Sequence, residues 1–236
     1  IMVKKYIYSK QESLWGEPDC IGFGTDDFYI KEIDRKLANE IIIKNHYSKK
    51  VYNATYLHLG LFYKNKIKGV LQYGYAMNPA SCCSVVKGTK QNEYLELNRM
   101  WISDDCKKYA ESQAISYSIK YIKKKLKTIK WIQSFADERC GGFGIVYQAC
   151  SFDFFGEHKS DFWEFEGEIY HNSIITNNNR NKKKELENKG FSKKAIKKTL
   201  RQFRYIKFID KRQKKNCLLK QMPYPKHYKE GVEKNG

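Results

Sequence analysis

An acidic residue and a tyrosine stand out in the stretch FADERCGGFGIVYQACSF, which spans residues 135–152. Asp137 ends an apolar run just before a glycine-rich turn, so its carboxylate can project into a crevice as a general base or a metal ligand. A carboxylate that only caps the turn is the alternative. Tyr147 follows on a short helix-like run and can protonate a leaving group. Because the chain holds 18 tyrosines, a core tyrosine is the other interpretation of Tyr147.

Arg99 and Ser112 are candidates for holding an anion. Arg99 lies in the strand-like run EYLELNRMWIS, and Ser112 lies at the start of a helix-like run, where backbone N–H groups attract phosphate or carboxylate. In a regular strand Arg99 shares a face with two leucines of the same run, which would bury its charge. The pattern predicts either a β-bulge near Asn98 that turns Arg99 away, or a dedicated anionic partner.

His46 is a candidate base or ligand directly after the first predicted helix, with a purely structural histidine as the alternative. The seven cysteines form no CxxC pair and leave one over, so we expect reduced thiols rather than a disulfide framework or a zinc ribbon. The glycines of GGFG lack the spacing and the downstream acid of a dinucleotide-binding motif, which excludes that site.

Hydrophobic periodicity predicts the elements that must position these side chains. Helices are expected at 34–45 behind an Asp34 N-cap, at 110–126, at 144–150 and, strongly basic, from Ser192. Strands are expected at 56–63 and 68–76 as a hairpin, at 93–103, 128–137, 154–171 with a turn near Glu166 and Gly167, and 204–209. The polar stretch 177–190 is expected to be mobile.

This order predicts an α/β fold, a mixed sheet with helices on both faces. Ligands of such sheets collect outside the carboxyl ends of strands, where helices begin. Two such ends lie near residues 99–112 and 137–147, so we expect the site there.

Charge is concentrated at the end of the chain. The net charge is +19, and from Arg180 onward 20 Lys and Arg stand against 5 Asp and Glu, so +15 of the net charge lies there. Such asymmetry favours a polyanionic partner, with a solvated tail that aids solubility as the alternative. Without a long apolar run or a signal peptide pattern, we expect a soluble, cytoplasmic protein with no membrane partner.

The motifs together resemble a known family. The strand, helix, strand and GIVYQACSF order resembles the GNAT acetyltransferase fold, with Tyr147 five residues before Phe152. NHYSKK, LNRMWISDD, AESQAIS, the stretch from Phe135 and the ending LRQFRYIKFI with PYPK are similar to the phage Mom family, divergent GNAT-like enzymes that modify adenine in DNA. The similarity runs from about Ile41 to Lys226.

The resemblance implies a mixed, mostly antiparallel sheet and transfer of a carbamoylmethyl-type group to the exocyclic amino group of adenine, protecting phage DNA from restriction. It implies a catalytic role for His46, Arg99, Ser112, Asp137 and Tyr147. The implied donor is a small molecule, acetyl-CoA or a related acyl donor, although the GNAT pyrophosphate loop expected between Ile102 and Ser112 contains no glycine here. Acetyl transfer alone cannot attach a group through a CH2, so a divalent metal such as iron, held by His46 and Asp137, is a further candidate.

Duplex DNA with the adenine flipped out is the implied partner. Its phosphates are expected to contact cations of the basic segment, namely Lys193, Lys194, Lys197, Lys198, Arg201 and Arg204. We divide the chain into a GNAT-like catalytic core, 1–175, and a basic C-terminal segment, 176–236, that completes the sheet and contacts DNA. The oligomeric state stays open, with a dimer among the alternatives.

Two other functions compete with DNA modification. An ordinary GNAT acyltransferase would act on a small amine, a protein or an aminoacyl or RNA-linked substrate. A nucleic-acid-binding protein that kept the fold and lost catalysis is the second alternative, against which the polar cluster of Arg99, Asp137 and Tyr147 counts.

Overall fold

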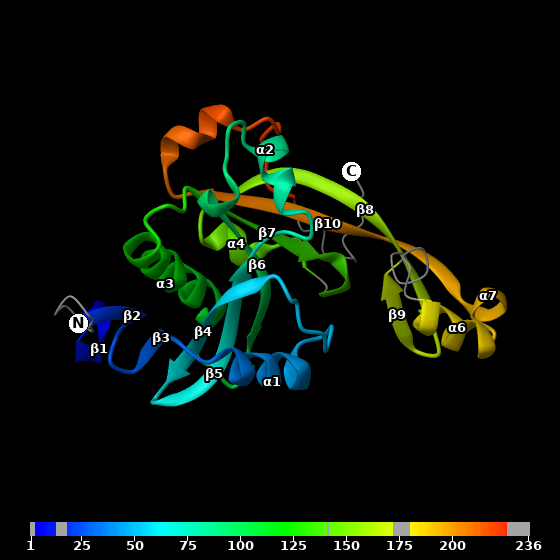
Figure 1. The fold of residues 1–236 in the computed structure, drawn as a ribbon, viewed down its shortest axis with the longest axis horizontal. Helices are drawn as coiled ribbons and strands as arrows, with labels where there is room; N and C mark the ends of the chain where they lie inside the picture. The colour runs from blue at the N-terminus through cyan, green and yellow to red at the C-terminus, as the bar shows by residue number, and fades with distance from the viewer. Residues whose placement is uncertain (1–2, 13–17, 141, 172–179, 226–236) are drawn as a thin grey trace, which may run out of the picture.

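The computed structural model describes residues 3–12, 18–140, 142–171 and 180–225 of the chain (Figure 1). The strands are β1 (Lys5–Glu12), β2 (Pro18–Gly24), β3 (Phe28–Glu32), β4 (Thr55–Tyr63), β5 (Lys66–Gly74), β6 (Tyr94–Ile102), β7 (Trp131–Asp137), β8 (Asp153–Phe165), β9 (Glu168–His171) and β10 (Ile196–Phe208). The α-helices are α1 (Arg35–Asn45), α2 (Cys82–Val85), α3 (Ala110–Lys125), α4 (Ile145–Ala149), α6 (Arg180–Asn188) and α7 (Phe191–Lys194). Short 3-10 turns are η1 (Pro79–Ser81), η2 (Gln91–Glu93), η3 (Glu138–Cys140) and η4 (Lys211–Asn216).

All ten strands of the described residues join one sheet in the order β1-β2-β3-β4-β5-β6-β7-β10-β8-β9. Only β6 and β7 pair in parallel, and α3 connects them as the crossover helix. The predicted mixed, mostly antiparallel sheet is therefore confirmed. β10 lies inside the sheet, between β7 and β8.

Helices cover both faces of this sheet, as predicted. On β5, Val70 packs with Ala38 and Ile42 of α1, whereas its neighbour Leu71 packs in the cluster that includes Ile115 of α3. Successive side chains of a strand point to opposite faces, so α1 and α3 lie on opposite sides. Tyr147 of α4 belongs to the α3 cluster, so α4 shares that face.

Local signals in the sequence set α1. The Asp34 side chain accepts a hydrogen bond from the backbone N–H of Lys36 at 2.7 Å, which satisfies one of the free donors at the helix start. The helix ends at Asn45, and His46 follows with extended backbone while its N–H donates to the Ile42 carbonyl at 2.9 Å. The predicted helix and its N-cap are confirmed.

The β-bulge predicted near Asn98 is present. Arg99 pairs with Gln72 and Leu97 pairs with Tyr73 across β5 and β6, so Asn98 is the extra residue. The insertion reverses the side-chain alternation, so Leu97 packs in the α3 cluster while Arg99 turns to the α1 face. The charge of Arg99 thereby leaves the apolar core.

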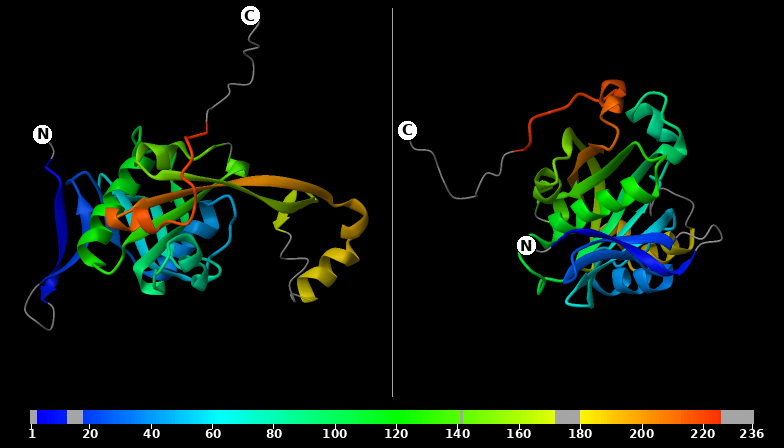
Figure 2. Two further views of the ribbon diagram at one scale, coloured as in Figure 1. Left: turned by 90° about the horizontal axis from the view of Figure 1, so that it is seen from above. Right: turned by 90° about the vertical axis from the view of Figure 1, so that its left-hand side faces the viewer.

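An extension, here called the arm, projects from the sheet (Figures 1 and 2). It consists of residues 159–171 and 180–201, where β10 pairs with β8 but no longer with β7. β8 and β9 form the predicted hairpin, whose two turn residues, Glu166 and Gly167, have φ of 50° and 77°. A small cluster of Phe165, Leu186 and Phe191 holds α6 and α7 against the hairpin.

Three expectations need correction. The basic helix expected from Ser192 is wrong, because only α7 is helical and β10 begins at Ile196, where β8 supplies hydrogen-bonding partners. The stretch expected to be polar and mobile contains α6, although residues 177–179 lie outside the described residues. β1, β2 and β3 also extend the sheet by three strands that the pattern did not predict.

Candidate active site

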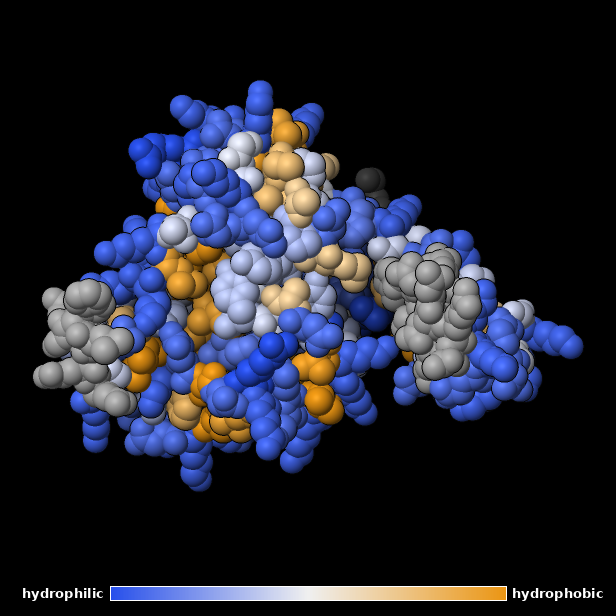
Figure 3. All heavy atoms as spheres, viewed as in Figure 1, coloured by the Kyte–Doolittle hydropathy of each residue, from blue (hydrophilic) through white to orange (hydrophobic). Residues whose placement is uncertain are grey.

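A cleft of about 980 Å³ lies on the α1 face of the sheet. Its walls come from residues 47–52 after α1, from β6, β7 and β10, and from β8 and the turn before β9 in the arm. In Figure 3 pale and orange side chains gather between α1 and α2 on an otherwise mostly hydrophilic face. The volume is typical of pockets that bind small molecules.

Asp137 faces this cleft but is held in an ion pair with Arg139. Arg139 Nε lies 2.9 Å from both carboxylate oxygens, its backbone N–H donates at 3.0 Å, and the Tyr47 hydroxyl donates at 3.4 Å. Burial acts to raise the pKa of Asp137, but the hydrogen bonds from Arg139 outweigh it and hold the pKa below its ordinary value. A carboxylate of lowered pKa is a poor general base.

The Arg139 guanidinium is stacked between aromatic rings. Its carbon lies 5.3 Å from the ring centre of Tyr47 and 4.5 Å from that of Phe162 on β8. Because Tyr47 follows α1 and Phe162 belongs to the arm, Arg139 connects the two walls of the cleft.

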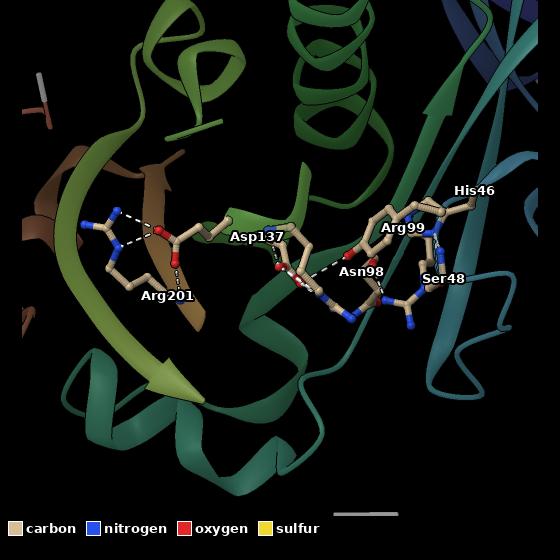
Figure 4. Close-up of polar contacts among 9 residues, drawn as sticks. His46, Ser48, Asn98, Arg99, Asp137 and Arg201 are labelled. Carbon is tan, nitrogen blue, oxygen red and sulfur yellow. Dashed lines mark hydrogen bonds and ion pairs between the residues drawn. The ribbon is translucent and has the colours of Figure 1, made fainter. Parts of the chain in front are cut away.

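His46 is buried beside this pair and neutral at physiological pH. Its Nδ1 accepts a hydrogen bond from the Ser48 backbone N–H at 3.1 Å and lies 2.8 Å from the Ser48 hydroxyl, so the ring proton is assigned to Nε2 (Figure 4). Burial, with the charges of Arg99 and Arg139, lowers the pKa of His46 to about 4.

Arg99 also lines the cleft. Its Nε donates to the Lys50 carbonyl at 3.3 Å, its guanidinium donates to the Asn98 carbonyl at 2.7 Å, and its carbon lies 5.6 Å from the Tyr52 ring centre. Figure 4 shows Arg99, Asn98, His46 and Asp137 grouped on this side, apart from Arg201. Of the five predicted catalytic residues, His46, Arg99 and Asp137 are thus brought together.

Tyr147 and Ser112 lie on the other face, at α4 and α3. The Tyr147 ring packs 5.6 Å from Phe152 and 5.4 Å from Tyr205, between ring centres. The Ser112 hydroxyl donates to the Tyr109 carbonyl at 3.1 Å, and the Cys150 thiol joins the two helices by donating to the Ser112 carbonyl at 3.1 Å.

The two faces meet where the central strands separate. β6 and β7 pair only as far as Leu97 and Ser134, although β6 runs on to Ile102 and β7 to Asp137. Asp137 therefore stands at the end of a strand whose β6 side is no longer paired. A ligand that reached both Asp137 and Tyr147 would pass through this separation.

The predicted DNA-contacting cations fall into three environments. Lys197, Lys198 and Arg201 form ion pairs with carboxylates of β8 or η3, with Asp161 at 2.8 Å for Lys197 and Glu138 at 2.7 Å for Arg201. Arg204 is turned into the cleft, 5.1 Å from the Phe135 ring centre. Lys193 and Lys194 are exposed at the tip of the arm, and no ion pair within the described ranges involves them.

The residues in the cleft do not fit a divalent metal. His46 uses Nδ1 for Ser48, and Asp137 uses both carboxylate oxygens for Arg139. Across the described part of the chain, no three His, Cys, Asp or Glu side chains are grouped as a metal site would require. The pair expected to hold iron is therefore not supported.

Several residues that line the cleft were not predicted for the site, among them Tyr47, Glu96 and Arg139. Arg204 was predicted as a DNA contact and not as a cleft residue. Glu96 alternates with Leu95 and Leu97 and resembles an outward strand residue. A signal existed for Arg139, since an arginine two residues after a strand-ending aspartate can pair with it. The arm residues that line the same cleft as Glu96 and Arg204 have no comparable local signal.

The chain resembles proteins of one sequence family and several solved structures. The model of the Mom protein family matches residues 27–226. Methylcarbamoylase mom of Escherichia phage Mu is 42% identical over 226 residues, which cover 94% of each chain. A ribosomal-protein-S5-alanine acetyltransferase from Vibrio fischeri is 12% identical with a TM-score of 0.48, covering 81% of this chain and 98% of the other. A probable acetyltransferase from Staphylococcus epidermidis is 9% identical with a TM-score of 0.46, covering 77% of this chain and 99% of the other.

Within residues 3–225, apart from the undescribed stretches, no helix is long and apolar enough to cross a membrane.

Proposed function

The chain belongs to the Mom protein family, and on that premise we propose that it is a DNA-modifying transferase. It adds a carbamoylmethyl-type group to the exocyclic amino group of adenine and so protects phage DNA from restriction in the host cytoplasm. The phage Mu relative is a methylcarbamoylase. This supports the chemistry, since that relative and this chain share 42% of their residues over almost their whole length.

The observation that carries the proposal is the cleft on the α1 face. An adenine inside a duplex is paired and stacked, so the enzyme must extrude the base into a pocket that stacks on it and offers polar groups. The cleft provides rings from Tyr47, Tyr52 and Phe135, with Arg99 and Arg204 between them. Its volume of about 980 Å³ is enough for a nucleotide and part of a small donor.

The basic residues support a DNA partner. We place the phosphates along the arm, where Lys193 and Lys194 are exposed and Lys197, Lys198 and Arg201 can exchange their carboxylate partners for phosphate oxygens. Arg204 is assigned to the base rather than to the backbone, because it lies inside the cleft. The arm then forms one wall of a groove along which the duplex lies.

The site residues take the following proposed roles. Arg99 contacts the extruded nucleotide, the buried His46 holds Ser48 in the cleft wall, and Asp137 fixes Arg139 between the walls rather than acting as the base. Tyr147 protonates the leaving group from the α4 face, and Ser112 helps to position α3 against α4 through Cys150.

The donor is proposed as a small molecule with an electrophilic carbon and an anionic leaving group. Acetyl-CoA fits this class, but the residues before α3 do not fit the glycine loop that a pyrophosphate requires. Tyr109 precedes the helix with φ of 64°, a left-handed conformation, and neither it nor its neighbours back to Ile102 is a glycine. No step is therefore assigned to coenzyme A.

Nucleoside analysis tests the proposal. The protein is expressed in Escherichia coli, genomic DNA is digested, and deoxyadenosine is examined by mass spectrometry. A new deoxyadenosine species with the mass of an added carbamoylmethyl group is expected for the wild type and at least 100-fold less for Tyr147→Phe, since proton transfer contributes about 10²–10⁴ to a rate. Unmodified DNA from cells that contain the folded wild-type protein would refute the function.

A further inference from the structure

Glu96 lies on the floor of the cleft, and the proposed function gives it no role. It lies on β6, opposite Gln133 of β7, in the last part of the pair before the two strands separate. Its side chain is half-buried and lines the cleft. Two amides hold the carboxylate: Gln133 Nε2 donates at 2.7 Å to one oxygen, and Asn98 Nδ2 donates at 3.0 Å to the other.

The same two amides leave their own carbonyl oxygens without partners. Gln133 Oε1 and Asn98 Oδ1 are buried and accept no hydrogen bond from any described residue. If either amide were turned over, its carbonyl oxygen would face the Glu96 carboxylate and repel it. The two carbonyl oxygens therefore lack partners because the NH2 groups of the same amides hold the ionised Glu96 in place. Unsatisfied buried acceptors are unfavourable and are concentrated where function requires them.

Each carboxylate oxygen of Glu96 can accept more than one hydrogen bond, so both retain capacity toward the cleft. Asp137, by contrast, accepts from Arg139 on both oxygens and from Tyr47. Among the carboxylates of β6 and β7 in the cleft, Glu96 is therefore the one held only by neutral amide donors.

Resting on the proposed function, we infer that Glu96 is the catalytic residue that receives the proton of the adenine amino group. The amino nitrogen forms a bond to the electrophilic carbon of the donor, the bond from that carbon to its leaving group breaks, and the leaving group departs with the electron pair. The surplus N–H proton passes to the Glu96 carboxylate. The bulge at Asn98 thus fixes Glu96 as well as redirecting Arg99.

The surroundings of Glu96 adapt it to this role. Burial raises its pKa above the ordinary glutamate value, against the hydrogen bonds of Gln133 and Asn98 and the charges of Arg204 and Arg99. Tyr52 and Tyr94 are its other titratable neighbours, and their own pKa values are raised, so both are neutral in the range where Glu96 titrates. The reaction should therefore slow in acid as Glu96 becomes protonated.

Rates are measured in buffered extracts of expressing cells, which supply the donor, with added duplex DNA and mass spectrometry of deoxyadenosine. Glu96→Gln is expected to lower the initial rate at least 100-fold, within the usual range of about 10²–10⁴ for a general base. Its melting temperature and its affinity for DNA, measured by fluorescence anisotropy, should stay close to wild type. Glu40→Gln, which removes an exposed carboxylate of α1 outside the cleft, is the matched control and should keep the wild-type rate.

The wild-type rate should also fall as the pH is lowered into the acid range, independently of any variant. A Glu96→Gln protein that keeps more than a tenth of the rate overturns the inference, and so does a wild-type rate that is flat over this range, even where the variant does not fold. Wild-type extracts that produce no modified deoxyadenosine refute the proposed function instead, which separates the two failures.

Discussion

Removing either partner of the Asp137 and Arg139 ion pair should destabilise the protein far more than breaking an ion pair on the surface would. The side chains are only 7% and 21% exposed, and the carboxylate accepts three hydrogen bonds of 2.9–3.0 Å from Arg139 alone. Asp137→Ala breaks this mostly buried ion pair by removing its carboxylate, and breaking a buried pair costs about 3–5 kcal/mol. At about 2–4 °C per kcal/mol for a chain of this size, the melting temperature should fall by about 6–20 °C.

The double variant Asp137→Ala/Arg139→Met separates this cost from the loss of packing. With neither charge present no uncompensated ion remains, so its destabilisation should be smaller than the sum of the two single variants by about 2–3 kcal/mol. Urea denaturation followed by tryptophan fluorescence gives the three free energies of unfolding. If the costs of the two single variants sum to the cost of the double variant within about 0.5 kcal/mol, the reasoning is refuted.

Three further outcomes follow from the structure. The pKa of His46 is lowered to about 4, so the unfolded chain takes up a proton first as the pH falls below about 6.5. Stability is therefore highest above that value and is lost toward pH 4, by at most about 3 kcal/mol, and His46→Gln should flatten this dependence in urea titrations. Gly144→Ala should cost about 2–5 kcal/mol, because φ is 82° and the new Cβ would lie 2.4 Å from an aromatic ring, whereas Gly88→Ala, with open space around it, should cost about 1–2 kcal/mol. Replacing Lys193 and Lys194 by Gln should reduce the slope of the logarithm of the DNA-binding constant against the logarithm of salt concentration, by up to about 0.9 per lost phosphate contact. Replacing the two ion-paired lysines of β10 should reduce this slope less. Fluorescence anisotropy at several salt concentrations measures both slopes.

Sequence patterns predicted the helices, strands and turns that are determined by residues close together in the sequence. The Asp34 cap and the apolar spacing of the first helix, the alternation of β4 and β5, and the turn at Glu166 and Gly167 all depend on residues close in sequence. The bulge at Asn98 was predictable for a physical reason, because a regular strand would have buried Arg99 in the core. The stretch after Ser192 was not predictable in this way. Its lysines and leucine suit a helix, and only the distant strands β7 and β8 make it a strand.

The site shows the same division. Asp137 and His46 could be chosen as polar residues at the ends of elements, and Arg99 as a charge that a regular strand would bury. The structure places Asp137 and Arg99 in one cleft, with the buried His46 beside them. Glu96 could not be chosen, because its environment depends on Gln133, 37 positions later in the chain, and on the arm that closes the cleft. The reversal of Asp137 from base to ion-pair partner depends on a side-chain orientation that spacing does not determine.

The position of β10 has a consequence for synthesis of the protein. This strand, residues 196–208, lies between β7 and β8, so while the ribosome is still making it both neighbours have an unpaired edge. The cleft also stays incomplete, because Arg204 and the inner strand of the arm are missing. Modification of DNA should therefore begin only when nearly the whole chain has emerged, and premature termination before Ile196 should yield an insoluble product rather than a partly active enzyme.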